Sequence, residues 1–409
     1  MVTASTNAEG QKLFEQIMLN PMSEDPYSGY HQLRALAPAL LTDDGNNLIL
    51  TRYADCDAAL RHRAFGKGNE IQGFRLSPVP EHKLRPMLAR MERSMHFANP
   101  PEHTRLRQVV SAAFSVQSVD AMRAGIAARI DALLDELAAQ DGGDFMSVVA
   151  HPLPLQIMAD LLGIPESDHL DFGARVAEHT ALAEPTIDAE ALDRAITAEA
   201  ELAAYFTDLL RAKRRTPGDD LLSQLVSSDA GESLDEIEMV ATAQLLLGAG
   251  IETTSNLLGN GMHALLTHPE ELNRLREDPG LIPGAVEEIL RYASPVHIDA
   301  RTVLEPVTFL SADLKPGQTV TTLLGAANFD PARFENPDVF DVGRTDNGHI
   351  AFASGIHYCM GAHLSRLEIG QFMNRLLSRY SGVALAGPAR RRPRLGLRGF
   401  ASLPVSLER

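Results

Sequence analysis

The segment from Phe352 to Gly361, FASGIHYCMG, combines a residue that could do chemistry with residues that could position it. Cys359 lies in a glycine-punctuated loop, and the apolar pattern after it is typical of a helix. A thiolate at a helix N-terminus is stabilised by the helix dipole and by free backbone N–H groups. Gly355 would allow a sharp turn, and Gly361 would let the backbone approach whatever the sulfur binds. Two interpretations follow: Cys359 is a buried structural cysteine, or its thiolate is the axial ligand of a haem iron.

The spacing of this segment favours the haem interpretation. The pattern Phe-x-x-Gly-x-His-x-Cys-x-Gly resembles the haem-ligand loop of the cytochrome P450 family. The resemblance implies that Cys359 is the metal ligand, that Phe352 packs against its sulfur, and that His357 reaches a haem propionate. Ala353 stands where many members of the family have glycine, and alanine tolerates fewer backbone conformations.

A second stretch with chemical potential is Gly248-Ala-Gly-Ile-Glu-Thr-Thr254. Two glycines inside a predicted helix each cost about 1 kcal/mol relative to alanine. Either another helix packs closely there, or a flat ligand lies against a slightly opened helix whose carbonyls bond threonine and water. The stretch resembles the distal-helix motif of the same family. The resemblance implies that Ala249 and Gly250 lie against the haem and that Glu252 and Thr253 deliver protons into a dry pocket.

Cationic side chains could bind the two carboxylates of a haem. His103 and Arg107 lie one turn apart on a predicted helix, which by itself is the pattern of a solvated helix face. In their sequence context they resemble the family's second propionate clamp, and Arg301 resembles its propionate-binding arginine. His349 is a further candidate. Together with His357, these side chains would supply more than enough partners for two carboxylates.

The remaining motifs are structural or line a pocket. Glu288 and Arg291 resemble the family's buried Glu-x-x-Arg pair, although the same spacing on a surface helix is worth under about 1 kcal/mol. Val339-Phe340 stands where the family often has a third, basic partner nearby, so that partner is left open. By the same resemblance, the substrate pocket is expected to be lined by Leu246, Ala249, Val296, His297, Ile298 and Phe400.

Composition limits the class of protein. At 409 residues with 44% hydrophobic and 22% charged residues, the chain can bury a large core. The net charge of −17 argues against a nucleic-acid partner and against a polybasic membrane surface. No signal peptide or membrane span is visible, and Cys56 and Cys359 form no disulfide framework. We therefore expect a soluble cytoplasmic protein.

Hydrophobic periodicity predicts a mainly α fold with small peripheral β-sheets. Residues 1–12 are expected to be disordered, and 13–409 to form a single cytochrome P450 domain. A capping-box signature from Ser233 to Glu236 opens a helix of roughly 50 Å that ends near Leu266. Residues 64–98 lack periodicity, which is typical of a functional loop. Shorter helices are expected at 27–37, 117–139, 146–163, 187–213, 217–227 and 360–380, with a hairpin at 40–51.

The resemblance implies a haem-thiolate monooxygenase that binds heme b. It would insert one oxygen atom from dioxygen into an apolar small molecule by hydroxylation or epoxidation. With no flavin or iron–sulfur motif in the chain, electrons would come from a ferredoxin and an NAD(P)H-dependent ferredoxin reductase. Two alternatives remain: a peroxygenase driven by hydrogen peroxide, and a non-catalytic haem-binding sensor. The intact pair Glu252 and Thr253 argues against both.

Overall fold

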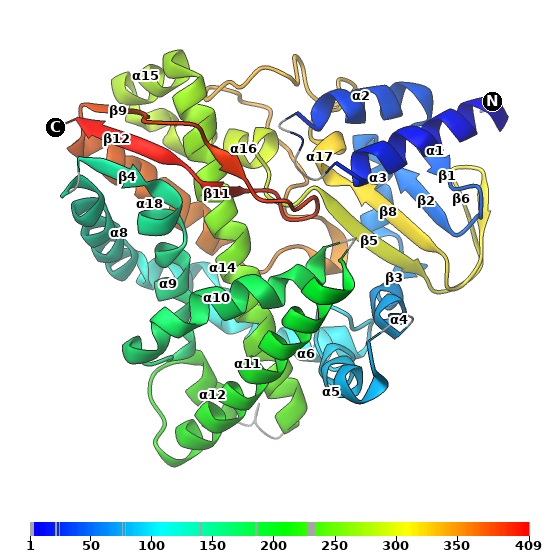
Figure 1. Ribbon diagram of the computed structural model, residues 1–409, viewed down its shortest axis with the longest axis horizontal. Coiled ribbons are helices and arrows are strands. Elements are labelled where there is room, and N and C mark those ends of the chain that lie inside the picture. Colours follow the sequence, from blue (N-terminus) through cyan, green and yellow to red (C-terminus); the bar gives the residue numbers. More distant parts are fainter. Residues whose placement is uncertain are drawn as a thin grey trace.

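A 32-residue helix, α14 (Glu236–Thr267), runs through the centre of the molecule, and other helices pack around it (Figure 1). Its N-terminus is closed by a reciprocal capping box: the Asp235 carboxylate accepts the Glu238 N–H at 2.8 Å, and the Glu238 carboxylate accepts the Asp235 N–H at 3.0 Å. The box thus lies two residues later than predicted, because the buried Leu234 packs into the core ahead of the cap. Ser233 lies outside the described residues.

The computed structural model describes residues 4–20, 23, 25–75, 77, 79–139, 141–184, 187–227 and 234–408. Within them the chain is mainly helical, as predicted. Besides α14, the helices are α1 (Ala4–Met18), α2 (Tyr27–Leu36), α3 (Tyr53–Arg61), α4 (Asn69–Arg75), α5 (Glu81–Met91), α6 (Glu102–Ser111), α7 (Val116–Ala121), α8 (Arg123–Ala138), α9 (Pro152–Leu162), α10 (His169–His179), α11 (Ala189–Arg215), α12 (Leu221–Ser227), α15 (Pro269–Glu277), α16 (Ile282–Tyr292), α17 (Leu324–Ala327) and α18 (Ala362–Arg379).

The sheets are small and peripheral. The largest has the order β1-β2-β8-β5-β3 and is antiparallel except for the parallel pair β2 and β8. Its strands are β1 (Ala39–Leu41), β2 (Asn47–Leu50), β3 (Phe65–Gly66), β5 (Ile298–Val303) and β8 (Thr319–Leu323). Three smaller sheets comprise β4 (Gly142–Asp144), β12 (Pro404–Glu408) and β9 (Gly382–Leu385); β6 (Val307–Phe309) and β7 (Ala312–Leu314); and β10 (Arg390–Arg391) and β11 (Phe400–Ser402).

The N-terminal segment differs from the prediction. Residues 4–12, which were expected to be disordered, belong to α1. Leu13, Phe14 and Ile17 pack on the cluster formed by α2 and the neighbouring strands, and the backbone of Gly10 approaches Ala37 and Leu40. This half-buried apolar stripe on one side of α1 packs against the domain, which stabilises the helix as a whole.

Residues 64–98 also contain more regular structure than expected. The short helices α4 and α5 lie there, the second with Pro86 inside it. Neither is long enough to show a clear periodicity, and each is stabilised by a satellite cluster in which Ile71, Leu84 and Met87 pack against Leu192 of α11. Helix α10 was not predicted at all.

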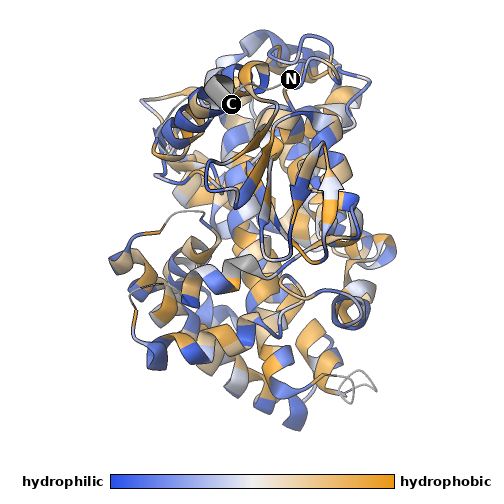
Figure 2. Cartoon of the chain, turned by 90° about the vertical axis from the view of Figure 1, so that its right-hand side faces the viewer, coloured by the Kyte–Doolittle hydropathy of each residue, from blue (hydrophilic) through white to orange (hydrophobic). Residues whose placement is uncertain are grey.

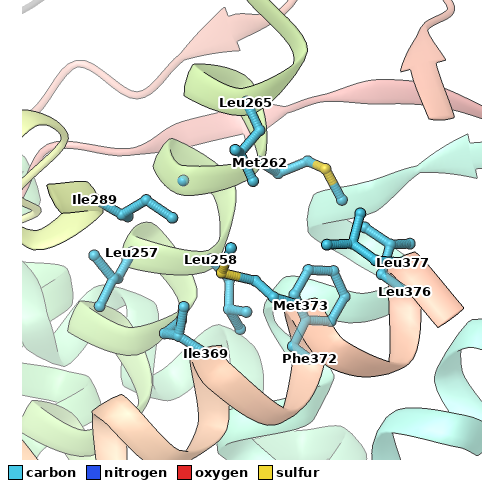
Figure 3. A pocket seen from close by; sticks show the side chains of 11 residues that line it. Leu257, Leu258, Met262, Leu265, Ile289, Ile369, Phe372, Met373, Leu376 and Leu377 are labelled. Carbon is cyan, nitrogen blue, oxygen red and sulfur yellow. The ribbon is translucent and has the colours of Figure 1, made fainter. Parts of the chain in front are cut away.

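Apolar residues hold the helices to α14. Figure 2 shows hydrophobic and hydrophilic residues interleaved along most helices, as expected for elements that bury one side. Where α14 meets α16 and α18, an entirely apolar gap of about 10 Å³ remains (Figure 3). That space is close to the minimum for one water, and it offers no polar partner, so it is a packing gap and not a ligand site. No described helix is long and apolar enough to cross a membrane.

Candidate functional site

The loop before α18 folds back on itself around Cys359. The Cys359 N–H donates to the Phe352 carbonyl at 3.0 Å, which closes a loop of eight residues. Gly355 has φ +73°, and a side chain there would strike the Leu60 carbonyl at the end of α3. Ser354 donates to Asp57 of the same helix at 2.7 Å. The turn therefore requires glycine, and α3 fixes the position of the loop.

The sulfur of Cys359 lies beside its own loop and a helix start. A Cβ on Gly361 would lie 4.0 Å from the sulfur and meet nothing else, so this glycine leaves space next to it. Burial raises the pKa of the Cys359 thiol, and the Gly361 N–H and the guanidinium groups of Arg107 and Arg366 oppose that shift. The ring of Phe352 lies under the Arg366 guanidinium, 4.7 Å from ring centroid to Cζ.

Four cationic or imidazole groups from distant elements converge beside this loop. The rings of His103 on α6 and His357 are 4.3 Å apart. Arg301 on β5 donates through Nη1 to both oxygens of Asp299 at 2.7 Å, and Lys67 donates to the same carboxylate at 2.8 Å. Burial, then Arg301 and His103, lower the pKa of His357 to about 2.

This cluster has polar atoms that no described residue satisfies. Arg301 Nε and Nη2 and His357 Nε2 are buried without a hydrogen-bond partner among the described residues. Buried donors of this kind are costly unless something accepts from them. An anion with two carboxylates fits this arrangement, since Arg301 and His357 would each gain an acceptor.

Two predicted members of the cluster point elsewhere. Arg107 donates through Nη2 to the Tyr358 carbonyl at 2.6 Å, so it braces the Cys359 loop from α6. The His349 side chain is 3% exposed, and its Nε2 lies 3.2 Å from the Glu287 carboxylate without a hydrogen bond among the described residues. The centroid of its ring lies 6.0 Å from that of Phe352.

On α14 the predicted motif divides into two faces. Ala249 is exposed and Thr253 half-buried, in the middle of a helix that is otherwise almost entirely buried. These two residues, one turn apart, face open space, and the Thr253 hydroxyl donates to the Ala249 carbonyl at 2.7 Å. A Cβ on Gly250 would lie 2.6 Å from the Met158 sulfur of α9, and one on Gly248 would lie 3.3 Å from His179 of α10. Both glycines therefore permit close helix packing.

Glu252 points to a different side of α14. Its carboxylate is 3% exposed and lies 2.5 Å from Arg392 Nη1 and 3.4 Å from Arg394 Nη1. Asn256, one turn later, donates to it at 3.4 Å. Arg392 and Arg394, in the C-terminal segment, are thus partners of a buried acid.

Comparison with known proteins identifies the family. The family model described as cytochrome P450 matches residues 187–279 and 280–396. The monooxygenase PikC of Streptomyces venezuelae is 38% identical over 94% of this chain and 92% of its own, and the vitamin D(3) 25-hydroxylase of Pseudonocardia autotrophica is 36% identical over 100% and 99%. The chain belongs to the cytochrome P450 family. A solved P450BioI, in complex with acyl carrier protein carrying hexadec-9Z-enoic acid, superposes with a TM-score of 0.88 at 35% identity, covering 94% of this chain and 99% of that one.

As a cytochrome P450 of bacterial type, the protein is a monooxygenase that binds heme b. Its unsatisfied buried donors, the sulfur of Cys359 and the open face of Ala249 and Thr253 are consistent with that cofactor. Among the described residues, no cluster of three or more His, Cys, Asp or Glu could hold a different metal.

The Glu288 and Arg291 pair is completely buried and bidentate, at 2.7 and 2.8 Å. Arg344 donates to the same carboxylate at 3.1 Å and supplies the third, basic partner that the sequence left open. Arg291 also donates to the carbonyls of Asn328 and Pro337, so the group ties α16 to the irregular segment before the Cys359 loop. Arg344 comes four residues after Phe340, and because of this offset it was not recognised from the sequence as the third partner.

The residues predicted to line the substrate pocket lie in different parts of the structure. His297 is 1% exposed, and its Nδ1 lies 3.1 Å from the Tyr30 hydroxyl. It borders a separate cavity of about 260 Å³ near the C-terminal half of α14. Phe400 packs on His263 and Arg391, also toward that half. Leu246 lies on α14 one turn before Ala249 and Gly250, and Val296 bridges to Leu397 ahead of Ile298 in β5.

Proposed function

We propose that this cytochrome P450 uses dioxygen and electrons from a separate ferredoxin and its NAD(P)H-dependent reductase to oxidise an apolar small molecule in the cytoplasm. Heme b, bound through the Cys359 thiolate, would supply the oxygen-activating chemistry. His103, Arg301 and His357 would bind its carboxylates, while Arg107 would hold the thiolate loop in place. The observation that supports this assignment best is the set of unsatisfied buried donors beside that loop.

Thr253 and Glu252 would have different roles in proton delivery: Thr253 would bind a water, and Glu252 would relay protons to it. The Thr253 hydroxyl donates its hydrogen bond to the Ala249 carbonyl, so its oxygen is free to accept a hydrogen bond from a water in the open space beside it. Glu252 is held by Arg392 and Arg394 on another side of α14. To relay a proton toward Thr253, its carboxylate must exchange an arginine for water, so the two arginines would control how fast protons arrive.

The substrate would be lipid-like, terpenoid or polyketide. The face presented by Ala249 is apolar apart from Thr253. Two relatives support this class: one is named for vitamin D(3), and another was solved with a hexadecenoyl chain on its carrier protein. A screen for compounds that shift the haem absorption band would identify the substrate.

Thr253→Ala tests the monooxygenase assignment against the peroxygenase alternative. Without the hydroxyl, no group at this position would hold the proton-donating water. The variant should therefore keep consuming NAD(P)H but release hydrogen peroxide in place of most product. Turnover driven by added peroxide should fall much less. Product per NAD(P)H is the measurement, and Thr254→Ala, which removes a buried neighbouring hydroxyl, is the matched control. Unchanged coupling in Thr253→Ala would assign proton delivery to another group.

A further inference from the structure

His179 is the last residue of α10, where that helix packs on α14 (Figure 1). A Cβ on Gly248 would lie 3.3 Å from its Nδ1 and 3.6 Å from its Cε1. The imidazole therefore fills the space that Gly248 leaves on the central helix. The next residue of α14, Ala249, carries the exposed side chain of the face shared with Thr253. His179 thus lies at the edge of the open space in which substrate must bind.

Among the described residues, the His179 ring has no hydrogen-bond partner. Its Nδ1 is buried and has no hydrogen bond among the described residues, although the residue as a whole is only half-buried. His169, at the other end of the same helix, is different, because its Nε2 lies 3.2 Å from the Ile164 carbonyl. An unsatisfied buried nitrogen costs free energy, so a ring held in this position calls for a water or a ligand.

The last turn of α10 is fixed in place on both sides of His179. Arg394 donates to the Ala177 carbonyl at 2.5 Å and to the Thr180 hydroxyl at 3.0 Å. The same arginine reaches Glu252 on α14. A side chain whose backbone is anchored in this way can hold a ligand group at a defined place.

The charge around the ring favours a neutral ligand group. Burial lowers the pKa of His179; Glu199 opposes that shift and Arg90 adds to it. Glu199 and Arg90 pair with each other at 2.5 and 2.6 Å, so their charges largely cancel. A neutral imidazole offers one donor and one acceptor, which suits a hydroxyl or a carbonyl better than a carboxylate.

We propose that His179 is a specificity-determining residue that hydrogen-bonds a hydroxyl or ketone oxygen on an otherwise apolar substrate. The inference rests on the proposed function and narrows its substrate class to compounds that already carry a neutral oxygen substituent.

Binding of cyclododecanol, cyclododecanone and cyclododecane to the haem-loaded protein tests this proposal. The three rings are alike in size and differ in the oxygen. Titrations followed by the haem absorption band should show the alcohol and ketone binding about tenfold more tightly than the hydrocarbon, the value of one good hydrogen bond. His179→Phe should abolish that preference, and His179→Gln should restore part of it. His169→Phe, the matched control on the same helix, should leave the preference unchanged.

A crystal structure of the haem-loaded protein with cyclododecanol provides a second, independent test. A hydroxyl oxygen within hydrogen-bond distance of a His179 nitrogen would support the proposal. It is overturned by an oxygen bound elsewhere, by protein groups on both ring nitrogens, by equal affinities for the three compounds, or by no binding of any. The ferrous CO spectrum and the coupling lost in Thr253→Ala report on the proposed function, so its failure would be seen separately.

Discussion

Ala353 adopts a backbone conformation that an alanine rarely takes. Its φ of +57° lies in the left-handed region, directly before Ser354 and the turn at Gly355. A Cβ in that region costs roughly 1–2 kcal/mol, so the glycine of the family pattern that this loop resembles would suit the conformation better. The resemblance exposed this departure in the sequence, but only the structure shows that the loop keeps the glycine-type conformation.

Ala353→Gly should stabilise the protein. It removes the left-handed strain and loses part of the gain through a more flexible unfolded chain, for a net increase of about 1 kcal/mol in the free energy of unfolding. Denaturant unfolding of the haem-loaded protein measures it. Ala351→Gly, in the same loop but with no positive φ, should instead destabilise by a similar amount. Equal changes in the free energy of unfolding of the two variants would show that the backbone of Ala353 is not strained.

Glu368 on α18 is a buried acid with no role in the site. It is 2% exposed, and its Oε2 has no hydrogen-bond partner among the described residues. Burial alone raises its pKa from 4.5 to about 8. Folding therefore takes up a proton between these two values. The stability that Glu368 contributes is complete below pH 4.5 and is lost as the pH rises through about 8.

Glu368→Gln should flatten that dependence. Between pH 5 and 7 the wild type should lose up to about 1.4 kcal/mol of stability per pH unit relative to the variant, because only the wild type must take up the proton. Denaturant titrations at several pH values measure the difference. Glu270→Gln, at an exposed position, is the control and should follow the wild type. Parallel curves for Glu368→Gln and wild type would show that this carboxyl ionises freely.

At the scale of elements, the sequence predicted what short spacing can encode. The Cys359 loop and the Glu288–Arg291 pair were identified because their residues lie within ten positions of one another, and the long helix because its apolar periodicity is continuous. Their partners come from far along the chain: Arg392 reaches Glu252 across 140 residues, and Lys67 reaches Asp299 across 232. Such partners carry no local signal, because a basic residue in a loop resembles a solvated one until the fold brings an acid to it.

The C-terminal segment is therefore part of the α14 site. Arg392→Met should lower the free energy of unfolding by about 2–3 kcal/mol, since it leaves the buried Glu252 carboxylate with only the longer contacts to Arg394 and Asn256. Arg390→Met, at an exposed position two residues earlier, should change it by under about 0.5 kcal/mol. Chemical denaturation compares the two. A matching small effect at Arg392 would mean that the ion pair contributes nothing to stability.

At the scale of the whole molecule, charge shapes how an electron donor would approach. The chain carries a net charge of −17, so an acidic ferredoxin is repelled at long range unless a local patch attracts it. Arg105 on α6 does not supply such a patch, because it pairs with Glu102 at 2.8 Å and with Glu238 at 2.6 Å. The exposed residues of the Cys359 loop are instead apolar or aromatic: Ile356 is 49% and Tyr358 40% exposed.

We expect a ferredoxin to dock through these two side chains, which lie three residues and one residue before Cys359 in the sequence. Ile356→Glu would place a charge in the centre of that contact and should slow reduction by ferredoxin about tenfold, a loss typical of an apolar interface anchor. Stopped-flow formation of the ferrous CO complex measures it, with dithionite reduction as the check that the haem site is intact. Leu310→Glu changes a side chain of similar exposure, 46%, at the turn between β6 and β7, and should leave the rate near that of wild type.

Because Arg105 is already neutralised by two carboxylates, Arg105→Glu should have a smaller effect than Ile356→Glu. If Arg105→Glu has the larger effect, the docking contact lies on α6 and electrostatic steering is its main determinant.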